Sequence, residues 1–269
     1  MSAPADRYSH GHHESVLRSH RWRTAENSAG FLLPHLKRDD TVLDVGCGPG
    51  TITVDLAHLV APGLVTGVDL SEEVVEVARE TSEGRRVDNV RFAVDDVYDL
   101  SFAESTFDVV FAHQVLQHLS RPVDALLEMR RVLRDGGLVA VRDADFAAFA
   151  WFPLDDRLSR WMELYHQITR ANHAEADAGR RLIEWVREAG FRDVVASSSN
   201  WTFHDPSERS WWGQLWADRV RVSEFARQGV EYGLTTTAEL NEIAVAFLEW
   251  ARSDDGVFIV VNGEVLARR

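Results

Sequence analysis

The sequence has a single cysteine and no excess of basic residues. Cys47 alone excludes an intrachain disulfide framework and a multi-cysteine metal site, and it is compatible with a reducing compartment. The chain has 29 lysines and arginines against 43 acidic residues, a formal net charge of −14. It therefore lacks the basic surface that a nucleic-acid backbone requires, which favours a small-molecule substrate over DNA or RNA.

Long apolar segments are also missing. The first 20 residues contain neither an apolar stretch of signal-peptide length nor a cationic start, and no uncharged apolar run is long enough to cross a bilayer. We therefore expect no membrane association and a cytoplasmic location. The 269 residues suit one α/β domain with an added cap better than two independent domains. The sequence does not decide whether the chain forms a homodimer.

Short apolar segments alternate with helical patterns through the first half of the chain. The patterns predict strands at 41–45, 64–68, 90–94, 107–112 and 137–143, with helices between them. Nearly continuous apolar strands that alternate with helices are typical of a parallel sheet covered on both faces. The first half therefore predicts an α/β core over residues 37–145, preceded by an N-terminal helical lid over residues 1–36.

After Asp143 this alternation ends. The patterns predict helices at 155–171, 179–189, 206–228 and 236–252, and strands at 193–203 and 257–267. Tryptophans concentrate in this half of the chain (Trp151, Trp161, Trp201, Trp211, Trp212, Trp216 and Trp250). We expect residues 146–269 to supply the last strands of the sheet and helical cap insertions, at about 146–176 and 205–254, over its carboxyl edge.

A glycine-rich loop, Asp44-Val45-Gly46-Cys47-Gly48-Pro49-Gly50, follows the first predicted strand. Its glycines remove side chains where the chain turns from strand into helix, so backbone amides and a helix amino terminus can approach a ligand. In open parallel sheets, ligands bind at the carboxyl ends of the strands. The loops after the first four strands should therefore face one site.

Acidic residues follow the next two strands. Asp69 ends the second strand, where a carboxylate can accept hydrogen bonds from both ribose hydroxyls. The alternative is that Asp69 caps the next helix, but Ser71 can fill that role. Asp95 and Asp96 follow the third strand, and one of them can meet an adenine amino group. The site is acidic, and no basic residue lies near the glycine loop. Such a site is better suited to a cofactor that carries positive ammonium and sulfonium groups than to a cofactor that carries a negative pyrophosphate. S-adenosylmethionine is a cofactor of the first kind.

Residues 41–143 resemble the class I S-adenosylmethionine-dependent methyltransferases, specifically their ubiquinone/menaquinone-biosynthesis-like branch. The resemblance rests on the glycine loop, on Val94-Asp95-Asp96-Val97, on Phe107-Asp108-Val109-Val110 through Leu119, and on Arg134-Asp135-Gly136-Gly137-Leu138. It implies a Rossmann-like seven-stranded sheet, mostly parallel with an antiparallel last strand, plus helical cap insertions. The cofactor contacts it implies are Asp44, Gly46, Cys47, Gly48, Asp69, Leu70, Asp96, Val97 and, at the methionine end, His113.

A further cofactor candidate lies near the amino terminus. Ser19-His20-Arg21-Trp22-Arg23 is loosely similar to a His-x-x-Trp-Lys element of the ubiquinone enzymes, with the spacing shortened by one residue. Arg23 is therefore a candidate for the cofactor carboxylate, with an ordinary surface arginine as the alternative.

Methyl transfer from a sulfonium is an in-line displacement, so positioning supplies most of the catalysis. A general base is needed only if the acceptor must lose a proton. His113 and His118 flank the loop after the fourth strand and are the candidates, because imidazole titrates near neutral pH. The alternatives are that His113 shapes the methionine pocket and that His118 packs on the following helix.

The tryptophan-rich cap favours an apolar or aromatic methyl acceptor, although many of these rings should be core. Candidate acceptor contacts are Tyr8, Trp211 and Arg180, the last of which can instead meet a neighbouring carboxylate. The cluster His10, His12 and His13 lacks the spacing of a metal site, so we predict no metal. Whether carbon, oxygen or nitrogen is methylated stays open.

Two other functions remain possible from the sequence. A nicotinamide-dependent oxidoreductase would need a catalytic pair such as Tyr-Lys, which we do not find. The chain could also bind S-adenosylmethionine without transferring its methyl group. Methylation of adenine or of glutamine amides is disfavoured, because Ala112-His113-Gln114-Val115 stands where those enzymes carry an Asp/Asn-Pro-Pro-Tyr/Phe motif.

Overall fold

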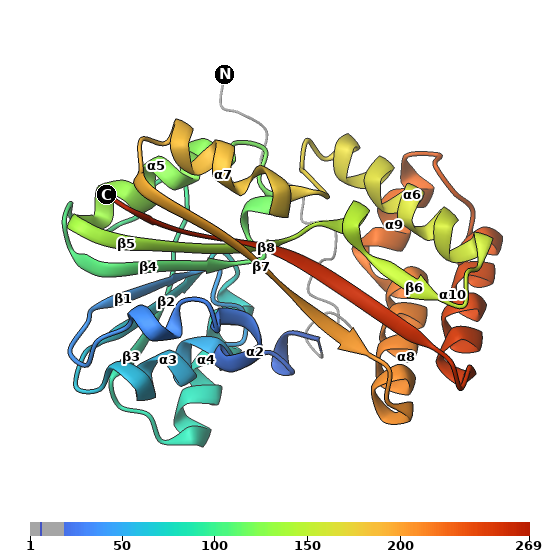
Figure 1. Cartoon of the computed structure of the whole chain (residues 1–269), viewed down its shortest axis with the longest axis horizontal. Coiled ribbons are helices and arrows are strands. Elements are labelled where there is room, and N and C mark those ends of the chain that lie inside the picture. The colour runs from blue at the N-terminus through green and yellow to red at the C-terminus, as the bar shows by residue number, and fades with distance from the viewer. Residues whose placement is uncertain (1–5, 7–18) are drawn as a thin grey trace.

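The computed structural model describes residue 6 and residues 19–269, and these form a core and a cap that share one sheet (Figure 1). In the first half, strands and helices alternate as predicted. The elements of this core are β1 (Val42–Val45), α3 (Thr51–Val60), β2 (Val65–Asp69), α4 (Glu72–Arg85), β3 (Val90–Val94), β4 (Phe107–His113), α5 (Pro122–Val132) and β5 (Leu133–Ala144).

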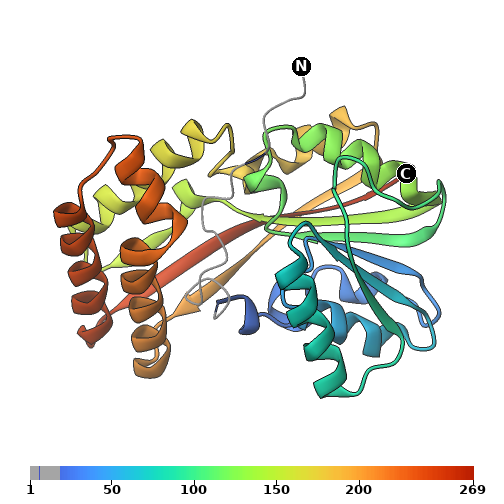
Figure 2. The same cartoon turned by 180° about the vertical axis from the view of Figure 1, so that it is seen from behind.

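Strands β1 to β5 are parallel, in the order β3-β2-β1-β4-β5. Along β1, Val42 packs with α3 and α4 on one face, whereas Leu43 and Val45 pack with α5 and α7 (Ala178–Glu188) on the other. Figure 2 shows these two helical layers from behind. Because both faces are covered, β1 is buried at every position, which explains its uninterrupted apolar sequence around Asp44.

The last strands join the core to the cap. β7 (Arg192–Phe203) and β8 (Val257–Arg268) are antiparallel and pair along almost their whole length. The second half of β8 also pairs with β5, and its first half pairs with the short β6 (Ala150–Phe152). In Figure 1 this long ribbon runs from the core sheet to the helices of the cap, so one hydrogen-bonded sheet supports both parts.

The cap consists of α6 (Asp156–Ala171), α8 (Pro206–Val222), α9 (Glu224–Glu231) and α10 (Thr237–Arg252), packed on the end of the ribbon. Trp161 lies at its centre, in edge contact with Trp216 at 4.5 Å and Phe247 at 5.1 Å between ring centroids. Trp161, Trp212, Trp216 and Trp250 are all buried. Several of the cap tryptophans are therefore hydrophobic core, as expected.

The α/β class, the mostly parallel sheet and the antiparallel last strand are confirmed. The described residues form eight strands, one more than the predicted seven, because β6 was not foreseen. The helix predicted at 206–228 is two helices, since Ser223 has an extended backbone and donates its hydroxyl to the carbonyl of Arg219 at 2.7 Å. The apolar periodicity continues across this break, which hides it in the sequence.

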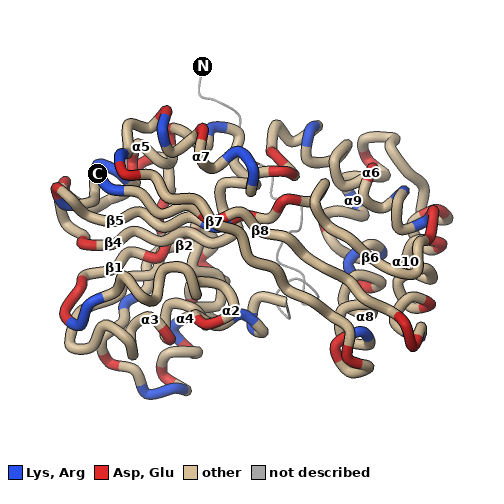
Figure 3. Tube along the Cα trace, in the orientation of Figure 1, with Lys and Arg blue, Asp and Glu red and all other residues tan. Residues whose placement is uncertain are grey.

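Before the core, the described part of residues 1–36 includes α2 (Ala25–Ala29) and the 3-10 helix Leu33–His35, which lie against the sheet beside α3. Within the described residues, none of the helices combines the length and apolarity needed to cross a membrane. Figure 3 shows acidic and basic residues interspersed along the outer helices. On α9, Arg227 pairs with Glu224 and Glu231.

A close backbone crossing fixes the ribbon on the core. A Cβ atom added to Gly263 of β8 would lie 2.1 Å from the carbonyl oxygen of Gly179 in α7. We therefore predict that Gly263→Ala lowers the free energy of unfolding by about 1–3 kcal/mol or more, because backbone atoms must separate. The control is Gly84→Ala in α4, where a Cβ meets nothing within 4 Å and better helix propensity should stabilise by about 0.5–1 kcal/mol. Urea unfolding measures both, and equal effects would contradict the close crossing.

Candidate active site

The glycine loop adopts a backbone that other residues rarely reach. Gly46, Gly48 and Gly50 have positive φ angles of 68°, 54° and 76°. A Cβ on Gly46 would lie 2.4 Å from Cγ2 of Val115, in the loop after β4, and one on Gly50 would lie 2.9 Å from the ring of Phe92. The loop therefore needs glycine both for its turn and for its close approach to neighbouring segments.

Two acids hold the loop and the helix that follows it. Asp69, at the end of β2, accepts hydrogen bonds from the amides of Gly48 and Ser71, both at 3.1 Å. Asp44 is buried and accepts from the hydroxyl of Thr53 at 2.6 Å, and its burial raises the pKa of the carboxyl to about 7. Asp69 thus ties the end of β2 to the glycine loop, and Asp44 ties β1 to α3, the helix after that loop.

Cys47 and Leu70 line the space above these acids. The Cys47 thiol is buried and lies 3.6 Å from the carbonyl oxygen of Gly48, and burial raises the pKa of this thiol. Nucleophiles need the thiolate, so this environment argues for a ligand contact instead. Leu70 is apolar but 72 % exposed, which leaves its surface available to a ligand.

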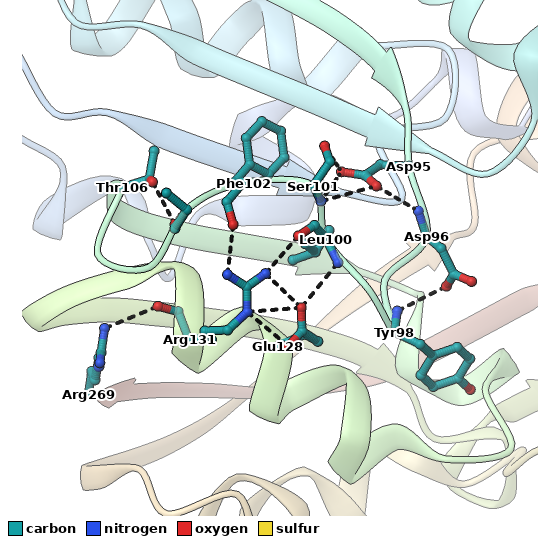
Figure 4. Close-up of polar contacts among 11 residues, drawn as sticks. Asp95, Asp96, Tyr98, Leu100, Ser101, Phe102, Thr106, Glu128, Arg131 and Arg269 are labelled. Carbon is teal, nitrogen blue, oxygen red and sulfur yellow. Dashed lines mark hydrogen bonds and ion pairs between the residues drawn. The ribbon is translucent and has the colours of Figure 1, made fainter.

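The two acids after β3 have different surroundings (Figure 4). Asp95 accepts from the amide and hydroxyl of Ser101, at 3.0 Å and 2.9 Å, and so closes the loop on itself. Asp96 is exposed and accepts from the amide of Tyr98 at 2.9 Å. Arg131 fixes the far side of the loop by donating to the carbonyls of Leu100 and Phe102. Asp96 is therefore the acid with more free carboxylate surface.

The end of β4 carries a polar cluster. Gln114 has a positive φ of 54°, a conformation that non-glycine residues rarely adopt outside constrained sites. Its side chain accepts from the guanidinium of Arg23 at 2.5 Å and donates to Asn262 of β8 at 3.2 Å. Arg23 also lies over the ring of Trp201, 5.6 Å from its centroid. Arg23 is thus part of the site wall, which differs from the surface arginine considered as its alternative.

Two histidines flank the same loop. His113 is 5 % exposed, and its Nδ1 lies 3.4 Å from a guanidinium nitrogen of Arg142 on β5. Burial and the nearby arginines lower the pKa of His113 well below its ordinary value. The Nε2 of His118 lies 3.0 Å from the amide nitrogen of Gln117, and burial lowers the pKa of His118 to about 3. Both rings are therefore neutral at physiological pH.

A buried acid beneath this loop was not among the predicted site residues. Asp143, in β5, has no exposed surface, and its Oδ1 accepts from the amide of Gln117 at 3.1 Å. Gln117 in turn accepts from the amide of Ala144 at 3.0 Å. The rule that ligands bind at the carboxyl ends of parallel strands would also have identified Asp143, if it had been applied to the fifth strand. Arg142 and its partner Glu264 carry no comparable sequence signal, because strands far apart in the chain bring them together.

One cavity of about 720 Å³ lies between core and cap and is lined by the glycine loop, by the residues after β2 and β3 and by the two histidines. Its opposite wall consists of rings from the ribbon and from α8, among them Trp201, Trp211, Trp212 and Trp216. The carboxylate of Asp6 closes part of the edge by accepting from the hydroxyl of Tyr98 at 2.5 Å and the amide of Ser120 at 3.0 Å. The cavity brings together the candidates Arg23, Asp44, Gly46, Cys47, Gly48, Asp69, Leu70, Asp95, Asp96, Val97, His113, His118 and Trp211.

Two candidate acceptor contacts are not in this lining. Arg180 makes a two-point ion pair with Asp145, at 2.7 Å and 2.5 Å, and lies outside the cavity wall. Of the two roles considered for Arg180, the structure therefore shows the ion pair with a neighbouring carboxylate. Tyr8 lies outside the described residues, as do His10, His12 and His13. Among the residues that are described, no group of three or more potential ligands could hold a metal ion.

Asp143 makes stability depend on pH. Burial raises its pKa to about 8, whereas an unfolded aspartate titrates near 4. Between about pH 4 and about pH 8 the folded state holds a proton that the unfolded chain releases, so this group lowers stability as pH rises through that window. We predict that Asp143→Asn, which keeps the acceptor for Gln117, gains stability relative to the parent chain from about pH 5 to about pH 8. Urea unfolding at several pH values measures this gain.

The control for this pH series is Asp135→Asn, because the Asp135 side chain is 98 % exposed and its substitution removes one negative charge without changing the core. A gap between parent chain and Asp143→Asn that does not change with pH would contradict the buried protonated acid.

Comparisons with known proteins show that this chain is similar to methyltransferases. Residues 36–201 match the family described as "Methyltransferase domain". An uncharacterized methyltransferase of Schizosaccharomyces pombe is 32 % identical over 280 residues, covering 100 % of this chain and 99 % of that protein. A demethylmenaquinone methyltransferase of Staphylococcus aureus is 37 % identical over 105 residues, covering 39 % of this chain and 43 % of that protein.

Among solved structures, a putative methyltransferase from Bacillus halodurans has a TM-score of 0.57 at 21 % identity, covering 88 % of this chain and 96 % of that one. It shows the same fold. The family match over more than half of the chain, together with the full-length relative, carries the assignment. This chain belongs to the S-adenosylmethionine-dependent methyltransferases.

Proposed function

We propose that this protein transfers a methyl group from S-adenosylmethionine to a small apolar or aromatic molecule, at carbon, oxygen or nitrogen. One observation carries the proposal: a single cavity of about 720 Å³ extends from the glycine loop to an aromatic wall in the cap. Small-molecule sites typically have about 300–1,000 Å³ and are mostly apolar with a few placed polar groups. The volume of this cavity lies within that range, and its lining combines polar groups on the core side with aromatic rings on the cap side.

The core side of the cavity fits the cofactor. The glycine loop leaves a cradle that side chains would fill, since a Cβ on Gly46 would strike Val115. We assign Asp69, which accepts from the amide of Gly48, to the ribose. We assign the exposed Asp96 and its neighbour Val97, at the next strand end, to the adenine. Arg23 is our candidate for the methionine carboxylate, because its guanidinium belongs to the cavity wall. When bound, the cofactor supplies an electrophilic methyl group on a sulfonium sulfur.

The cap side fits the acceptor. Trp211 contacts Trp22 and Phe203, with ring centroids 5.5 Å and 5.8 Å apart, so its indole is held in the cavity wall by other rings. Such walls exclude water and hold a flat apolar molecule in one orientation, which is what an in-line displacement needs. We therefore propose that the cap selects the acceptor and that positioning supplies most of the rate enhancement.

A relation to the ubiquinone/menaquinone-biosynthesis-like branch remains part of the proposal. The match to the demethylmenaquinone methyltransferase supports it, but that match covers 39 % of the chain. The acceptor class is therefore taken from the aromatic wall of the cavity and not from that relative.

Gly46→Ala should weaken binding of S-adenosylmethionine by about tenfold or more, because the new methyl group must displace Val115 and strain the backbone. The control is Gly136→Ala, where φ is also positive at 75° but no atom lies within 4 Å of the new Cβ. It should carry a similar backbone strain and leave cofactor affinity within about twofold. Isothermal titration calorimetry measures both, and similar affinities for the two variants would contradict the cradle.

Transfer itself is tested by incubating the enzyme with methyl-labelled S-adenosylmethionine and a panel of quinols, polyketides, terpenoids and small acids. With an accepted compound, Trp211→Leu should raise its KM by about tenfold and leave cofactor affinity unchanged, because one wall of the acceptor space is lost. Trp185→Leu is the matched control, since Trp185 is buried in the core beside α5, outside the cavity. Tight cofactor binding without transfer to any compound would instead support the non-catalytic alternative.

A further inference from the structure

The protonation pattern of His113 follows from its neighbours. Its Nδ1 faces a guanidinium nitrogen of Arg142 at 3.4 Å. Arginine has five N–H donors, no acceptor, and keeps its proton in proteins. This guanidinium favours the tautomer in which Nδ1 offers its lone pair to Arg142 and the proton of the neutral ring resides on Nε2.

Arg142 is held in place for this contact. It has no exposed surface, and its Nε donates to Glu264 at 3.2 Å and to Ser199 at 3.1 Å. Glu264 accepts further bonds from Ser199 and, at 2.8 Å, from Ser197. The guanidinium also lies 4.7 Å from the ring centroid of Trp201. The cluster spans β5, β8 and β7, so three strands fix the orientation of the group that faces His113.

The other ring nitrogen has no partner among the described residues. Nε2 of His113 is buried and makes no hydrogen bond there, although the ring belongs to the wall of the cavity. A buried N–H without an acceptor is costly, so it marks a place where a ligand atom completes the bond. The matching ligand atom is an oxygen with a free lone pair.

We propose that His113 is a neutral hydrogen-bond donor, whose Nε2–H binds a carbonyl or carboxylate oxygen of the methyl acceptor, and that Arg142 is the residue that positions it. This inference rests on the proposed methyl transfer and narrows its acceptor to an oxygen-bearing compound. It also removes His113 from the role of general base, because its lone pair is already used.

We assign this oxygen to the acceptor because the cofactor carboxylate already has a charged candidate partner in Arg23, whose guanidinium lies 5.6 Å from the ring centroid of Trp201. His113 lies edge-on to Trp201 of the aromatic wall, with the ring centroids 5.8 Å apart. The same wall includes Trp211, which we assign to the acceptor. A carboxylate or ketone on an aromatic compound that stacks in this wall can therefore reach Nε2.

The second histidine has the same kind of constraint. The Gln117 side chain accepts from the amide of Ala144 through its oxygen, so its amide nitrogen faces His118 and donates to the Nε2 of that ring. The lone pair of the neutral His118 ring is therefore engaged as well. Both histidines orient ligands or loops in this arrangement instead of accepting a proton.

The tautomer is measured directly by ¹⁵N–¹H correlation NMR on histidine-labelled protein, with His113→Phe used to assign the signal. We expect the Nε2–H form of His113 from about pH 5.5 to about pH 8. An Nδ1–H form or an imidazolium in that range would overturn the proposal. This readout needs no methyl transfer, so it separates a failure of this inference from a failure of the proposed function.

The positioning role of Arg142 is tested by the double variant Arg142→Gln with Glu264→Gln, which removes both buried charges together and avoids leaving one unpaired. We expect a mixture of the two His113 tautomers in the folded variant. An unchanged, pure Nε2–H signal would show that Arg142 does not set the tautomer.

The source of the oxygen is tested with a pair of probes of equal shape, 4-hydroxyacetophenone and 4-isopropenylphenol, added at millimolar concentration to the complex with S-adenosylhomocysteine. The ketone should shift the Nε2–H proton of His113 downfield, and the alkene should not. Equal responses, or no response to the ketone, would overturn the assignment to the acceptor.

Kinetic constants give a second test with the compound found in the methyl-transfer screen. His113→Phe keeps an aromatic ring and should lower kcat/KM for that compound by about threefold to tenfold, with cofactor affinity within about twofold. His113→Gln can accept from Arg142 and donate to the ligand, so it should restore part of the loss. Cofactor affinity about tenfold weaker in His113→Phe would assign the oxygen to the cofactor and contradict the proposal.

Discussion

The hydrogen-bonded ribbon of β7 and β8 is the constraint on which the rest of this structure depends. β8 pairs with β5 in the core over residues 262–268 and with β6 under the cap over residues 257–259, while β7 follows it along the other edge. Core and cap therefore share a continuous ladder, and the backbone crossing of Gly263 with Gly179 fixes it against α7. Because the ribbon also carries Trp201, it places an aromatic wall opposite the carboxyl ends of β1, β2 and β4. The cavity is a consequence of this arrangement.

The buried ion pair of Arg142 and Glu264 lies where the ribbon joins the core sheet, with both side chains almost fully buried. Removing two charges from water costs about as much as their attraction returns, so an apolar pair would give similar or greater stability. The pair instead fixes the orientation of the Arg142 guanidinium. It holds a guanidinium between His113 and Trp201, one residue on the core side of the cavity and one on the cap side, and thereby links the two walls electrostatically.

The sequence predicted the core well because its signals are local. Apolar runs, the glycine loop and the acids at strand ends each lie within a few residues, and parallel strands bring Asp44, Asp69 and Asp96 to one edge by a general rule. The cap was harder. The break at Ser223 and the strand β6 leave no periodic signal, and the ion pair of Arg180 with Asp145 was only one of two possibilities. Arg142, Glu264 and Ser199 could not be found at all, since only the register of β5, β7 and β8 brings them together.

We propose that one cavity binds S-adenosylmethionine on its core side and a small molecule on its cap side. Calorimetric titration of the protein with S-adenosylmethionine, S-adenosylhomocysteine and the oxidised and reduced nicotinamide nucleotides tests the first half of that claim most directly. We expect one site per chain for each of the two adenosyl compounds, with binding of one excluding the other, and no saturable binding of the nicotinamide nucleotides. Saturable binding of a nicotinamide nucleotide together with no binding of either adenosyl compound would contradict it.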